Sequence, residues 1–79
     1  MSHVAHELHE EFPADTQRLH ELKLGNPHFA RLAERYHDVN RDIHRAEAGV
    51  DAVNDDALEE MKKLRLNLKD EIAALLVKA

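Results

Sequence analysis

The stretch NPHFARLAERYHDVNRDIHRAEAGVDAVNDDALEEMKKLRLNLKDEIAALLVKA, residues Asn26–Ala79, decides the fold. In its first part, apolar residues recur at alternating spacings of three and four, which is the a/d seam of a helix that packs on another helix. Asn26 can cap this helix, and Pro27 suits its first turn. Gly49 suits the left-handed position just past its end. The pattern therefore predicts a helix over residues 27–48. Its seam residues are Phe29, Leu32, Tyr36, Val39, Ile43, Ala46 and Val50.

The same heptad pattern continues over residues 55–78 and predicts a second helix. Arg65 occupies the one polar position of this seam. Asp55 or Asp56 is the predicted cap, because carboxylates are favoured at the start of a helix. The apolar seam residues are Leu58, Met61, Leu68, Ile72, Leu75 and Ala79.

The two seams predict an antiparallel pairing, because facing positions in such a hairpin have a constant sum of residue numbers. The chain then folds back within residues 49–54, where the turn-forming residues lie. Agreement between seam and turn supports the hairpin. The predicted pairs are Phe29 with Leu75, Leu32 with Ile72, Tyr36 with Leu68, Ile43 with Met61, and Ala46 with Leu58.

Arg65 faces Val39 in this register. We expect its aliphatic stem to pack on the seam while its head group reaches water, Asp38 or Asp42. The alternative is that Arg65 anchors an acidic partner.

A second apolar stripe lies on residues 55–78, off the main seam, at Leu66, Ala73 and Val77. A helix with a broad apolar face is usually buried on that face. Three covers are open: the short helix at residues 13–24, a second hairpin that completes a four-helix bundle, or a helix of another protein.

Length and composition limit the alternatives. The chain has 79 residues and no cysteine, so it forms one domain at most and has no disulfide. A core of this size rarely supplies more than about 3–5 kcal/mol by itself. We therefore expect self-association, a partner, or packing of the N-terminal segment to add buried surface.

The net charge of −5 argues against a nucleic-acid binder, which normally has a basic surface. The local basic group at residues 62–69 alternates with acidic residues at helical spacing, which indicates a solvated face with i,i+4 pairs. Its members are Lys62, Lys63, Arg65 and Lys69.

Residues 1–12 form a polar, histidine-rich extension with weak helical periodicity. His3, His6 and His9 recur every three residues, and carboxylates lie beside them. One interpretation is a surface zinc, nickel or copper site. The other is a polar helix face rich in histidine. The second is favoured, because this spacing does not place two histidines side by side around one ion.

Residues 13–24 predict a short helix that begins at Pro13 and stops at Gly25. Twelve residues are marginal for a helix in isolation. We expect it to dock on the hairpin, on a second copy, or on a partner.

The sequence contains no pattern that indicates catalysis. It has no nucleophile–base arrangement, and its two glycines stand apart at helix ends, so we expect a protein that is not an enzyme. His37 and His44 are expected to be exposed spectators, with a pH-dependent interface as the alternative. No apolar run reaches 18 residues, so we expect no membrane span. The polar N-terminus lacks a signal-peptide core, which favours the cytoplasm.

Several short motifs follow one another along the chain: Phe12-Pro13, Leu22-Lys23, Asn26-Pro27-His28-Phe29, Ile43 with Glu47, Met61-Lys62-Lys63-Leu64, and Leu68-Lys69-Asp70-Glu71. Their order resembles the YdcH-like family of small bacterial proteins, a domain of unknown function. The resemblance extends over about residues 12–76 and implies a short helical hairpin. It implies no catalytic residue, because the family has no established activity.

The sequence thus predicts an all-α protein: an antiparallel, coiled-coil-like hairpin of two helices with a short N-terminal helix. It predicts self-association into a helical bundle, with a dimer as the favoured oligomer, or else binding of a helical protein partner. The expected function is a non-enzymatic interaction or adaptor module of the bacterial cytoplasm, without a cofactor. The alternatives are metal binding by the N-terminal histidines and, second, weak nucleic-acid association.

Overall fold

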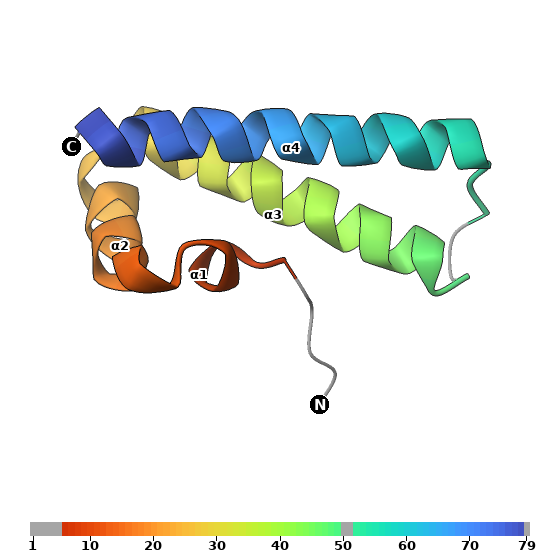
Figure 1. Cartoon of the computed structure of the whole chain (residues 1–79), viewed down its shortest axis with the longest axis horizontal. Helices are drawn as coiled ribbons and strands as arrows, with labels where there is room; N and C mark the ends of the chain where they lie inside the picture. The colour runs from red at the N-terminus through yellow and green to blue at the C-terminus, as the bar shows by residue number, and fades with distance from the viewer. Residues whose placement is uncertain (1–5, 50–51, 79) are drawn as a thin grey trace.

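The computed structural model describes residues 6–49 and 52–78, and the regular structure in this part is entirely helical. The all-α prediction is confirmed. Figure 1 shows the chain running out along α3 and back along α4, with α2 and α1 beside the beginning of α3. The elements are α1 (Leu8–Glu11), the 3₁₀ turn η1 (Pro13–Asp15), α2 (Thr16–Gly25), α3 (Pro27–Glu47) and α4 (Asp55–Lys78).

The start and end of α3 follow from local chemistry. The Asn26 side-chain oxygen accepts a hydrogen bond of 3.1 Å from the backbone N–H of Phe29, and Pro27 occupies the first turn. Asn26 also donates its backbone N–H to the carbonyl of Leu22 at 2.8 Å, which closes α2. Gly49 has a φ of 79°, the left-handed conformation that glycine adopts without a Cβ clash.

The predicted cap of α4 is wrong by one residue. The Asn54 side chain, rather than Asp55 or Asp56, accepts a hydrogen bond of 2.7 Å from the backbone N–H of Ala57. Asp55 and Asp56 are instead the first two helical residues. Their negative charges lie at the positive end of the helix dipole, which is a stabilising arrangement.

Contacts at two levels join α3 to α4. Asn40 contacts Arg65 at 2.8 Å, and Glu47 contacts Lys62 at 3.3 Å nearer the connection between the helices. Later positions of α3 therefore lie beside earlier positions of α4.

The core is wider than a two-helix seam. Leu19 of α2, Ala33 of α3 and Leu76 of α4 are buried, although none belongs to the predicted seam. The reason is that α2 packs against α3 and extends the apolar contact around the helix. Among the predicted seam residues, Val39, Met61 and Leu75 are half-buried and the following are buried: Phe29, Leu32, Tyr36, Ile43, Leu68 and Ile72.

Candidate functional site

An exposed apolar face lies on the outer side of α4. Leu66 keeps 57% of its surface exposed and Val77 keeps 86%, while Ala73 between them is half-buried. The short N-terminal helix does not cover this face, because α2 contributes Leu19 to the core on α3 instead. Of the covers expected from the sequence, a second copy and another protein's helix stay open.

A polar pair interrupts the contact between α3 and α4. Asn40 is fully buried, and its side-chain oxygen accepts a hydrogen bond from the Arg65 guanidinium at 2.8 Å. The sequence reasoning named water, Asp38 or Asp42 for the Arg65 head group and missed Asn40; Arg65 itself is half-buried. Asp38 instead pairs with Arg41 at 3.2 Å. A buried amide must find a partner, and Arg65 supplies it from the neighbouring helix.

The N-terminal segment His6–Phe12, here called the latch, is fastened to the long helices by polar contacts. The Tyr36 hydroxyl, in the core of α3, donates a hydrogen bond of 2.6 Å to the backbone carbonyl of His6. His6 has a φ of 65°, a strained left-handed conformation that a neighbouring contact must hold in place. The latch thus begins with a strained residue whose carbonyl accepts a hydrogen bond from the chain's single tyrosine.

Two carboxylates of the latch extend this attachment. Glu7 lies 3.3 Å from the ring nitrogen Nδ1 of His37 on α3. Glu11 lies 3.4 Å from the Lys69 ammonium on α4 and 3.2 Å from the His6 ring. The Lys69 ammonium also lies 6.0 Å from the centre of the Phe12 ring, within the range of a cation–π contact.

These charges and the burial of the site change two pKa values. Burial is the largest single influence on Glu11 and raises its pKa. The hydrogen bond to His6 and the charge of Lys69 outweigh burial, so the pKa of Glu11 lies below its ordinary value. Burial, together with the nearby Glu11 and Glu7 charges, raises the pKa of Tyr36 to about 12 against the lowering effect of Arg65.

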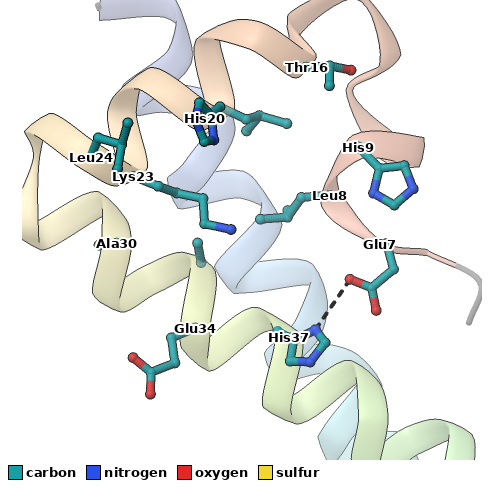
Figure 2. A pocket seen from close by; sticks show the side chains of 12 residues that line it. Glu7, Leu8, His9, Thr16, His20, Lys23, Leu24, Ala30, Glu34 and His37 are labelled. Carbon is teal, nitrogen blue, oxygen red and sulfur yellow. Dashed lines mark hydrogen bonds and ion pairs between the residues drawn. The ribbon is translucent and has the colours of Figure 1, made fainter.

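An open groove of about 740 Å³ lies between the latch, α2 and α3 (Figure 2). Its apolar lining carries Leu8, Leu19 and Ala33, and charged groups stand around it. In Figure 2, Lys23 reaches from α2 toward Leu8, and the Glu7–His37 pair closes the far end. The full lining is Glu7, Leu8, His9, Thr16, Leu19, His20, Lys23, Leu24, Ala30, Ala33, Glu34 and His37.

The structure tests the predicted histidine ligands only in part. His3 lies outside the described residues. His6 and His9 are both exposed, and the His6 ring contacts Glu11. Within residues 6–49 and 52–78, no group of three or more His, Cys, Asp or Glu side chains could hold a metal ion. A site that includes His3 stays a prediction.

Two groups at the site were missed by the sequence reasoning. Asn40 directly follows the seam residue Val39, and as a polar residue it was not expected to be buried. The sequence did contain one indication of its burial: Asn40 lies beside the seam of its own helix, and the seam of the facing helix has its one polar residue, Arg65, at the same level. His37 was expected to be an exposed spectator. It is exposed but contacts Glu7, which lies thirty residues earlier, and no local spacing reveals such a contact.

The comparisons with known proteins identify a family but no activity. A family model described as a protein of unknown function, DUF465, matches residues 29–76. This is more than half of the chain, so the chain belongs to that family, which includes the YdcH-like proteins. The match leaves out the latch, α2 and the motifs before Phe29. Searches of the curated proteins and of the solved structures gave no significant match.

Within the part of the chain that the structure describes, no helix combines the length and the apolar character that crossing a membrane requires.

Proposed function

We propose that this member of the DUF465 family is a non-enzymatic helix–helix interaction module, whose contact surface is the outer face of α4. The observation that carries the proposal is the exposure of Leu66 and Val77 on one face of a helix whose opposite side is already buried in the core. Ala73 lies between them and permits close approach of another helix. Removing such residues from water favours association by roughly 25 cal/mol for each Å² of apolar surface, before the entropic costs of association are subtracted.

We favour a second copy of the chain as the occupant of this face. Two antiparallel hairpins would then complete a helical bundle through their α4 helices. The alternative occupant is a helix of another protein, which would make the chain an adaptor. In either case the setting we propose is the bacterial cytoplasm.

The test is the solution mass of the full chain by sedimentation equilibrium over a wide concentration range. We expect the wild-type mass to rise above that of the monomer with concentration, and L66E/V77E to stay monomeric with unchanged helicity. The matched control V53E/N67E adds the same charge at exposed positions off this face, and it should associate like the wild type.

Two results would count against self-association. If L66E/V77E associates as strongly as the control, the α4 face is not the interface. If the wild type is monomeric throughout, the second copy is excluded, and a helical partner protein becomes the occupant to test with α4 as the bait surface.

A further inference from the structure

The latch resembles a bound peptide more than a part of the helical core. Its regular portion, α1, has only four residues, which is too short for a helix to be stable by itself. Its apolar residues Leu8 and Phe12 are only half-buried at the edge of the core. The order of the latch must therefore come from the surface on which it lies.

That surface, here called the acceptor surface, provides three polar contact points from two helices. Tyr36 and His37 belong to α3, and Lys69 belongs to α4. They bind the His6 carbonyl, the Glu7 carboxylate and the Glu11 carboxylate respectively, at distances of 2.6, 3.3 and 3.4 Å. The apolar edge of the core lies beside these points and receives Leu8 and Phe12.

The contacts define a recognition pattern. Glu7 and Glu11 are four residues apart, and so are Leu8 and Phe12. In the latch, Leu8–Glu11 forms one helical turn, and Glu7 and Phe12 flank it. A longer helix that carried the same four residues would present them on one side. The acceptor surface complements these residues with the Lys69 ammonium, the His37 ring and an apolar edge. Grooves that receive amphipathic helices use anchors at such spacings.

We propose that the acceptor surface is a docking site for a short acidic amphipathic helix of a partner protein, and that the latch occupies this site in the free protein. The partner helix would carry two carboxylates four residues apart, each followed by an apolar residue. It would displace the latch and bind the same three polar groups. Lys69 lies three residues after Leu66 on α4, so the two surfaces adjoin there. The two proposals are therefore tested with different variants and different readouts, the mass of the chain and the binding of a peptide, so that either can fail without the other.

The latch competes with a free partner helix for the acceptor surface. Because the latch is part of the same chain, its effective local concentration is high, and the free helix must bind strongly enough to displace it. Weakening the latch without changing the acceptor surface should therefore favour a free helix. E7Q/E11Q does this, because both substitutions lie in the latch and remove the charges that contact His37 and Lys69.

The test uses a capped synthetic peptide with the sequence of residues 6–15 as the probe. It is titrated into the ¹⁵N-labelled full chain while the backbone amide signals of Tyr36 and Lys69 are followed. We expect E7Q/E11Q to bind the probe on the order of tenfold more tightly than the wild type. A second probe, in which glutamine replaces the glutamates that correspond to Glu7 and Glu11, should bind more weakly.

A matched pair of lysines on α4 tests the surface itself. Adding K69E to E7Q/E11Q should abolish binding of the probe. Adding K63E should leave binding unchanged, because Lys63 is exposed and pairs with Glu60 at 3.9 Å. If E7Q/E11Q loses helicity by circular dichroism, the single variant E11Q replaces it in the same comparison.

Three outcomes would overturn the proposal. The first is that wild type and E7Q/E11Q bind the probe equally or not at all. The second is that K69E and K63E have the same effect. The third is a pair of results: L66E/V77E still dimerises, and K69E disrupts the dimer. The latch of a second copy, and not a partner protein, would then occupy the acceptor surface.

Discussion

The α3–α4 pair and the latch meet at Tyr36, but different forces hold them. Between the long helices, Phe29, Ile43 and Ile72 are completely buried, so removal of apolar surface from water dominates. The latch has two half-buried apolar residues and relies on hydrogen bonds and charges. Charged surface pairs typically contribute about 0–1 kcal/mol each. The long helices should therefore form the stable scaffold, and the latch should open at a smaller free-energy cost.

The largest expected effect comes from the scaffold. Ile72→Ala removes a completely buried side chain between α3 and α4 and should lower the free energy of unfolding by about 3 kcal/mol. Urea denaturation followed by circular dichroism measures this loss. Leu66→Ala on the exposed face is the control and should have far less effect on the monomer. Equal losses in the two variants would contradict the assignment of the core.

The second-largest loss of stability should come from the buried polar pair of Asn40 and Arg65. Asn40→Ala leaves the Arg65 guanidinium without its side-chain partner and should cost about 1–3 kcal/mol. Asn40→Leu with Arg65→Met replaces both polar groups and should recover much of that loss. Both are measured by denaturation. A double variant that is less stable than Asn40→Ala would show that the pair stabilises the fold beyond satisfying its own hydrogen bonds.

Tyr36→Phe should show whether the latch opens independently of the α3–α4 pair. It keeps the ring in the core and removes only the hydrogen bond to the His6 carbonyl, at a cost of about 1 kcal/mol. Amide hydrogen exchange should accelerate in the latch and stay slow in the middle of α3 and α4. Uniform acceleration over the whole chain would mean that latch and scaffold unfold as one unit.

The Tyr36 pKa offers a second measure of latch attachment. Its value of about 12 reflects burial first and then the Glu11 charge. Because the native state binds this proton more tightly than the unfolded state, stability should fall as pH rises from about 10 toward 12. Glu11→Gln should lower the Tyr36 pKa in a tyrosinate absorbance titration, whereas Glu60→Gln, on the exposed part of α4, should not change it.

The smallest effect concerns Glu11 in acid. Its native pKa lies below the ordinary 4.5, so its ionised form stabilises the fold above that pH. Protonation removes this contribution as pH falls through the native pKa. Glu11→Gln should therefore be less stable than the wild type at neutral pH, by under about 1 kcal/mol, which is the usual range for an ion pair near the surface. The difference should vanish in acid, as thermal unfolding at several pH values would show.

The sequence was sufficient for features that depend on neighbouring residues. The spacing of Phe29, Leu32 and Tyr36 indicated the buried side of α3, since side chains three and four apart share a helix face. Asn26 and Gly49 indicated its ends, because capping and positive φ are local properties of the backbone. The outward stripe at Leu66 and Val77 followed from the same periodicity.

Tertiary structure alone decided where the remaining groups meet. The burial of Asn40 depends on Arg65 of another helix, and the contacts of Glu11 depend on Lys69, which is distant in sequence. The docking of α2 on α3 widened the core to include Leu19 and Ala33. The physical reason is the same in each case: periodicity shows which side of a helix is apolar, whereas the partner of a polar or flanking residue is set by how separate helices pack.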